Sequence, residues 1–191
     1  MDRLSQLANK AGTDKGTTAF CSHSYTIIYN QLFDPLSLGH VKMLEIGVAD
    51  PRFPGASAQM WRDYFPDLYF VGYDINPEAK KYENVADYVH IFIGDQNNPE
   101  DLQRCIDEHG GEFDIILDDG SHYSEHILTS FENLFQHLKP EGYYVIEDLH
   151  SVYTNASVTL PKIDEIIERK NFKLEKVETG NYKLLIMKKG S

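Results

Sequence analysis

Two pairs of acidic residues in the middle of the chain carry most of its chemical information. Asp118 and Asp119 end one apolar run, Glu147 and Asp148 end another, and His122 follows the first pair. Apolar runs of this length between turn residues are typical of buried strands in a parallel sheet. Open α/β sheets bind ligands beyond the carboxyl ends of their strands, so we expect these side chains to lie close together. Because four carboxylates would repel one another there, the pattern predicts a cation between them.

The composition is that of a soluble globular domain. The chain has 191 residues, of which 41% are hydrophobic and 25% are charged, and this length is enough for one domain with its own core. The formal charge of −12 argues against nucleic acid and against an anionic membrane surface as partners. The N-terminus lacks a signal-peptide pattern, and no apolar run approaches the roughly 20 residues of a spanning helix. We therefore expect a cytoplasmic protein with reduced cysteines at Cys21 and Cys105, although the sequence leaves a disulfide open.

Strands and helices alternate along most of the chain. Residues 1–40 predict a front section of two short helices joined by a turn-rich loop, which we expect to act as a lid and as part of the acceptor wall, and residues 41–191 predict one α/β domain. The last two strands are joined by Thr179-Gly180-Asn181, which is a hairpin signal. The pattern indicates a doubly wound, mostly parallel seven-stranded sheet with an antiparallel C-terminal hairpin. The predicted strands are 42–48, 69–73, 89–93, 114–117, 143–147, 172–177 and 182–187, and the predicted helices are 57–64, 78–81, 99–109, 124–137 and 162–169.

The turns after the first three strands predict a cofactor that carries adenosine. Gly47 follows the first strand, where a glycine lets the backbone approach a ligand closely, although an ordinary tight turn explains it equally well. Asp74 ends the second strand, where an acid can accept both hydroxyls of a ribose. Asp95 and Gln96 end the third strand and can bind an adenine amino group. The combination is more specific than any one of these turns.

These turns resemble those of class I S-adenosylmethionine-dependent methyltransferases. In that superfamily the first turn is typically Glu/Asp-x-Gly-x-Gly, and the next two strands end in acids. Glu45, Gly47, Asp74 and Asp95 fit these places, while Ala49 replaces the second glycine. The resemblance implies a Rossmann-like methyltransferase fold that binds S-adenosylmethionine. The residues we assign to the cofactor site are Glu45, Gly47, Asp74, Asp95, Gln96 and Asp118, of which Asp118 alternatively orients the histidine or a water.

A narrower resemblance covers the two acid pairs. Together with Gly120-Ser121-His122, they are similar to the Mg²⁺-dependent sugar O-methyltransferases of antibiotic biosynthesis, of the mycinamicin type, and to their cephalosporin-hydroxylase-like relatives. The resemblance implies that Asp119, Glu147 and Asp148 hold Mg²⁺ and that His122 is the general base. Hard oxygen ligands suit Mg²⁺, and a histidine with a pKa of about 6.5 can accept a proton near neutral pH. The expected partner is a small glycosylated or polyhydroxyl acceptor, and a homo-oligomer stays open.

The front section shares the narrower resemblance. Gly12-Thr13-Asp14-Lys15-Gly16 and His23-Ser24-Tyr25 look like segments of the same group of enzymes. We expect Asp14 and Lys15 to close over the cofactor, and we place the specificity loops at 11–24, 50–56 and 150–161.

Other functions compete with this interpretation. A catechol-type Mg²⁺-dependent methyltransferase has a similar fold, but its last ligand pair is usually Asp-Asn, unlike Glu147-Asp148. His122 and His126 are four residues apart, so with a carboxylate they would also suit a non-heme iron oxygenase. A third alternative is a binding module that holds cofactor or metal without turnover. In the plainest interpretation, Asp118 and Asp119 cap a turn and His122 only begins a helix.

Overall fold

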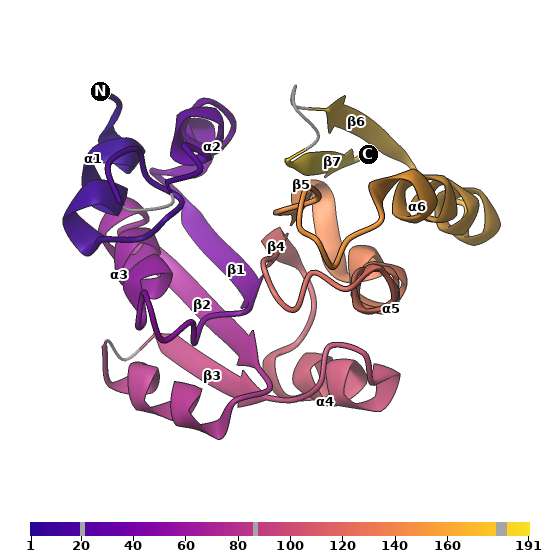
Figure 1. Ribbon diagram of the computed structural model, residues 1–191, viewed down its shortest axis with the longest axis horizontal. Coiled ribbons are helices and arrows are strands. Elements are labelled where there is room, and N and C mark those ends of the chain that lie inside the picture. The colour runs from indigo at the N-terminus through magenta and orange to yellow at the C-terminus, as the bar shows by residue number, and fades with distance from the viewer. Residues whose placement is uncertain (20–21, 86–87, 179–182) are drawn as a thin grey trace.

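The centre of the molecule is a mixed sheet of seven strands (Figure 1). We describe it from a computed structural model, which covers residues 1–19, 22–85, 88–178 and 183–191. The strand order is β3-β2-β1-β4-β5-β7-β6. The first five strands pair in parallel, and β7 pairs antiparallel with both β5 and β6. The predicted doubly wound fold is thus confirmed. The strands are β1 His40–Ile46, β2 Asp67–Asp74, β3 Val89–Ile93, β4 Phe113–Asp118, β5 Leu138–Ile146, β6 Leu174–Glu178 and β7 Leu185–Lys189.

Helices cover both faces of this sheet. Figure 1 shows α1, α2 and α3 grouped beside β1 and β2, with α4, α5 and α6 on the other side. The start of α4 follows from its sequence, because the Asn98 side chain accepts a hydrogen bond from the Glu100 amide and Pro99 occupies the first turn. The helices are α1 Arg3–Ala11, α2 Thr26–Phe33, α3 Ala56–Tyr64, α4 Pro99–His109, α5 Ser124–Leu134 and α6 Ala156–Lys170, with the 3₁₀ segments η1 Asp34–Leu36, η2 Pro77–Val85 and η3 Phe135–His137.

The two faces of the sheet bury two separate hydrophobic cores. In β1, Val41 and Met43 join the core beneath α1, α2 and α3, whereas Leu44 and Ile46 join the core beneath α4, α5 and α6. Successive side chains of a strand point to opposite faces, which explains this alternation. A polar residue at the end of a strand therefore points to one of the two faces of the sheet, and its distance along the strand from the core residues decides which.

The front section packs onto the first of these cores. Leu4 and Ala8 of α1 and Tyr29 and Phe33 of α2 have no exposed surface and share one cluster with Trp61 of α3. This packing brings the loop between α1 and α2 over the carboxyl edge of the sheet. Within the described residues, the longest helices lack the length and apolarity needed to cross a membrane.

The structure corrects some predicted boundaries. The last helix, α6, begins at Ala156 rather than 162 and contains Pro161 in its interior. A proline costs one intrahelical hydrogen bond, and the buried faces of Ile163 and Ile166 compensate for it. Strand β5 begins at Leu138 rather than 143, because the chain continues in the sheet across a register shift. The turn predicted at 179–181 lies outside the described residues.

Candidate active site and metal centre

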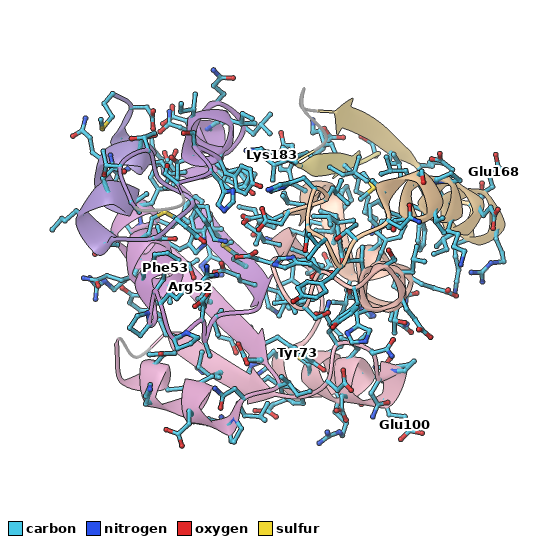
Figure 2. The ribbon with its side chains drawn as sticks, viewed as in Figure 1. Arg52, Phe53, Tyr73, Glu100, Glu168 and Lys183 are labelled. Carbon is cyan, nitrogen blue, oxygen red and sulfur yellow. The ribbon has the colours of Figure 1, made fainter. Side chains whose placement is uncertain are left out.

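A cavity of about 580 Å³ lies at the carboxyl edge of the sheet. This volume is within the usual range for small-molecule sites. Figure 2 labels three of its lining residues, Arg52 and Phe53 from the loop after β1 and Tyr73 from the end of β2. The turns after β1, β2, β3, β4 and β5 and the loop of the front section all contribute to it. Of the predicted site residues, the lining includes Gly47, Asp74, Asp95, Gln96, Asp119, His122 and Asp148 and leaves out Glu45, Asp118 and Glu147.

Gly47 allows the first turn to touch the fourth. Its φ is +86°, and a Cβ atom placed there would lie 2.0 Å from the Asp119 carbonyl oxygen. Only a glycine combines this backbone conformation with such a close approach. The turn is held by a 2.8 Å hydrogen bond from the Gly47 amide to the Tyr73 carbonyl.

Asp74 joins the first two turns. One oxygen of its carboxylate accepts hydrogen bonds from the amides of Val48 and Ala49, at 3.0 and 2.9 Å. The other oxygen accepts from the Asn76 amide at 2.8 Å. A carboxylate has about four acceptor sites, so Asp74 is fixed in place and still able to accept from a ligand hydroxyl.

Asp118 and Gln96 form a buried support behind the cavity. Asp118 accepts hydrogen bonds from the Ser130 hydroxyl of α5 at 2.5 Å and from the Gln96 amide group at 3.1 Å. The Gln96 carbonyl oxygen in turn accepts from the Ser121 amide at 2.8 Å. Burial raises the pKa of Asp118, and its hydrogen-bond donors oppose this shift. Asp118 therefore faces α5 and lies behind the cavity wall, where it contacts Gln96 and the Gly120 amide.

The ammonium group of Lys15 sits among three acids on the opposite face of the sheet. Its Nζ lies 3.5 Å from Glu45 Oε1 and 2.8 Å from Glu147 Oε2, and it donates to Asp119 Oδ2. Only 1% of Lys15 is exposed. Burial alone would lower the pKa of Lys15. The nearby charges of Asp119, Glu147 and Glu45 together outweigh burial, so the pKa of Lys15 is above its usual value. The side chain is thus a fixed internal cation.

Two aromatic residues complete this inner cluster. The Tyr29 hydroxyl donates to Glu147 Oε1 at 2.7 Å, and the Trp61 indole donates to Glu45 Oε2 at 3.1 Å. Burial raises the pKa of Glu45 to about 7, while the nearby Lys15 opposes the shift. Burial and the charge of Asp119 raise the pKa of Glu147, again against Lys15. Both carboxyl groups are buried, and their polar contacts come from protein side chains rather than from solvent.

The outer side of Asp119 faces a second cluster. Asp119 Oδ1 lies 3.9 Å from His122 Nε2, which lies 3.8 Å from Asp148 Oδ2. One ligand atom from each of these three residues falls within 4.8 Å of the others, a spacing compatible with a shared metal ion. The Tyr25 hydroxyl donates to Asp148 Oδ1 at 2.5 Å. His122 and Asp148 both have positive φ, +62° and +53°, which is uncommon outside glycine but is tolerated by Asp and His better than by most residues.

The structure also brings together residues that the sequence did not group. His23, Asp148 and His150 form another group spaced for a metal, with ring nitrogens 3.7 and 3.9 Å from Asp148 Oδ1. His126, the second histidine of the oxygenase alternative, contacts the Ser121 hydroxyl at 2.8 Å and joins neither metal-spaced group among the described residues. Each of the acids around Lys15 follows a residue of the core beneath α1, α2 and α3 by two positions, and this period of two is the sequence signal that places them on one face; the pairs are Met43 and Glu45, Leu117 and Asp119, and Val145 and Glu147.

The comparisons with known proteins agree on one group of enzymes. The chain is 40% identical over 153 residues to the 8-demethyl-8-alpha-L-rhamnosyl tetracenomycin-C 2'-O-methyltransferase of Streptomyces olivaceus, covering 78% of this chain and 38% of that protein. It is 40% identical over 134 residues to the mycinamicin VI 2''-O-methyltransferase of Micromonospora griseorubida, covering 69% and 33%. The solved structure of the methyltransferase MycE with Mg, SAH and mycinamycin VI superimposes with a TM-score of 0.82 and 30% identity, over 99% of this chain and 55% of that one. No protein-family profile matches the chain.

Sugar O-methyltransferases are therefore homologues of this chain. It has the fold of a class I S-adenosylmethionine-dependent methyltransferase, and the resemblance predicted from the sequence is confirmed. The chain spans less than two fifths of the length of the curated relatives it matches, 38% and 33% of the two named above.

Proposed function

We propose that this chain transfers a methyl group from S-adenosylmethionine to a sugar hydroxyl of a glycosylated natural product, with a divalent metal. One observation carries the proposal. A single cavity joins the cofactor turns at Gly47, Asp74 and Asp95 to the cluster of Asp119, His122 and Asp148. The names of the homologous sugar O-methyltransferases support the same chemistry, as do the Mg and SAH bound in the MycE structure.

The residues present fit both expected groups. For the cofactor, Asp74 offers free acceptor sites beside a glycine turn that no side chain blocks. For Mg²⁺, Asp119 and Asp148 offer carboxylate oxygens at the cavity wall, and Glu147 offers an oxygen already directed at a cation. Mg²⁺ bound there would supply positive charge that orients an acceptor hydroxyl and lowers its pKa.

His122 is the proposed general base. Its Nε2 faces the two carboxylates that line the cavity, so a proton taken from an acceptor hydroxyl would be stabilised by their negative charge. Tyr25 fixes Asp148 through its hydroxyl, and Asp148 lies beside the imidazole. The left-handed backbone at His122, with a φ of +62°, sets the direction in which the ring leaves the chain. Removal of that proton is the main chemical task left to the protein, because the sulfonium methyl is already electrophilic.

The front section has a proposed role as an inner wall rather than only a lid. Thr13, Asp14 and Lys15 line the cavity, and the loop that carries them joins α1 and α2, whose apolar faces pack in the core. His122 and Asp148 line the side of the cavity formed by the turns after β4 and β5. We propose that this side admits a small glycosylated acceptor.

The test is a binding titration followed by an acceptor screen. The metal-stripped chain is titrated with S-adenosylmethionine and then with Mg²⁺ in a calorimeter, and methyl transfer is measured on rhamnosylated polyketides, on their aglycones and on a catechol. We expect binding of both ligands and transfer to the glycosides only. Transfer to the catechol would favour the catechol-type enzyme. Failure to bind the cofactor, together with oxidation of an acceptor in the presence of Fe²⁺, would replace the proposal by the oxygenase.

A further inference from the structure

Lys15 occupies a position that suits a metal ion. Its Nζ lies between Asp119 Oδ2 and Glu147 Oε2 and contacts both, although these acids are 104 and 132 residues away along the chain. Both are predicted Mg²⁺ ligands, so a metal ion bound to the same two oxygens would require the space that the ammonium fills. The third carboxylate, from Glu45, lies on the far side of the ammonium at 3.5 Å.

The acids around Lys15 outnumber the cations that can compensate their charge. Three carboxyl groups, from Glu45, Asp119 and Glu147, surround one buried ammonium, so the inner cluster contains more acids than cations. Buried carboxylates without a cation would repel one another strongly. A divalent ion compensates them better than an ammonium does, and an ion bound to the same two oxygens would compete with the ammonium for them.

Lys15 lies on a short loop that is anchored on both sides, and the Thr26 amide donates to the Lys15 carbonyl at 3.1 Å. Lys15 belongs to the loop between α1 and α2, and the turn before it ends at Gly12, which has a φ of +79° and no atom within 4 Å of a placed Cβ. The loop is tied to the structure around it by hydrogen bonds of Asn9 with the amide and the hydroxyl of Thr17. The loop thus carries a cation on a short segment between two anchored helices.

We propose that Lys15 is a built-in competitor of the metal, which compensates Asp119 and Glu147 when no metal is bound and is displaced when Mg²⁺ binds. This inference rests on the proposed function, because it takes these acids as metal ligands. Displacement couples metal binding to a movement of the 12–18 loop, which also lines the cavity. The loop would then adopt its working position only in the metal-loaded protein.

The first experiment compares Mg²⁺ binding to the wild type and to Lys15→Met by calorimetry, with S-adenosylmethionine present. Removing the competing charge is expected to raise the Mg²⁺ affinity on the order of tenfold. Mg²⁺ is also expected to raise the unfolding temperature of Lys15→Met by more than that of the wild type, because it replaces the missing cation. The matched control is Lys10→Met, which removes an exposed lysine at the end of α1 and should leave both quantities unchanged.

A second measurement uses the wild type and so does not depend on the folding of a variant. Lysines are acetylated with an amine-specific reagent at several Mg²⁺ concentrations, and modification is located by mass spectrometry. Lys15 is expected to be protected without Mg²⁺ and modified at saturating Mg²⁺, while Lys10 reacts equally in both conditions.

The outcomes separate this inference from the proposed function. Mg²⁺ binding that is unchanged or weaker in Lys15→Met overturns the inference alone and would make Lys15 a permanent support of the ligands. Continued protection of Lys15 at saturating Mg²⁺ also overturns it. Absence of Mg²⁺ binding in both proteins overturns the inference and the metal-dependent function together.

Discussion

Adjacent acids in this chain have different neighbours because strand geometry separates them. Asp118 follows the side of β4 that faces α5, and it accepts from Ser130 and Gln96. Asp119 falls on the side that faces the front section, where it accepts from Lys15. The same alternation places Glu147 against Tyr29 of α2. At the scale of single residues, the neighbours of Asp118, Asp119 and Glu147 therefore follow from the face of the strand that each side chain continues.

This difference predicts opposite results for two neighbouring substitutions. Asp119→Asn is expected to abolish the calorimetric response to Mg²⁺ and to leave S-adenosylhomocysteine binding within about threefold of the wild type, because the adenosine turns are untouched. Asp118→Asn is expected to keep Mg²⁺ binding and to lose about 1–3 kcal/mol of stability, because an amide mismatches two buried donors. Loss of Mg²⁺ binding in Asp118→Asn would contradict the separation of roles.

His122 allows a test that keeps its unusual backbone. Asparagine tolerates the left-handed conformation, so His122→Asn should fold like the wild type, whose φ there is +62°. It should retain cofactor and metal binding and lose about 10²–10⁴-fold in turnover, because the proton acceptor is gone. His126→Asn is the control, because His126 lines the same cavity and faces Ser121 rather than the acids. Near-normal turnover in His122→Asn would remove His122 from the mechanism.

At the scale of elements, the site depends on how closely the βα turns approach each other. The turn after β1 contacts the turn after β4 at Gly47, and its amide is held by the end of β2. The register between these strands fixes this meeting point, because Ile46 pairs with both Tyr73 and Asp118. The proposed cofactor and metal parts of the cavity are thus joined through backbone rather than through side chains.

Gly47→Ala should therefore affect both parts at once. The added methyl group would lie 2.0 Å from the Asp119 carbonyl oxygen and would force a positive φ on alanine. We expect a loss of about 2–4 kcal/mol in stability and of measurable cofactor binding. Gly39→Ala is the matched control, because its nearest contact is an ordinary 3.7 Å from the Leu36 carbonyl. Chemical denaturation measures the first quantity and calorimetry the second, and equal behaviour of the two variants would contradict the role of the close approach.

At the scale of the whole molecule, local sequence patterns predicted the architecture better than the site. Apolar runs and the Asn98-Pro99 cap mark β3 and α4 at the boundaries that the structure has. The start of α6 was missed, because a proline normally marks a boundary and packing overrides that rule here. The contacts of Lys15 were also missed, because they depend on tertiary packing across more than half of the chain. The roles of the site residues remain predictions.

The packing of the front section leads to a prediction about the chain as a unit. Residues 1–40 contribute Tyr29 and Phe33 to the core of the sheet and Lys15 to the acid cluster. A fragment of residues 41–191 would expose the covered apolar face and would leave Glu45 and Glu147 buried without their cation. We expect it to show no cooperative unfolding transition by circular dichroism, whereas the full chain does. Addition of a peptide of residues 1–40 should restore the transition in proportion to its concentration. A fragment that unfolds cooperatively alone and binds S-adenosylhomocysteine would show instead that the front section is a separable lid on an independent domain.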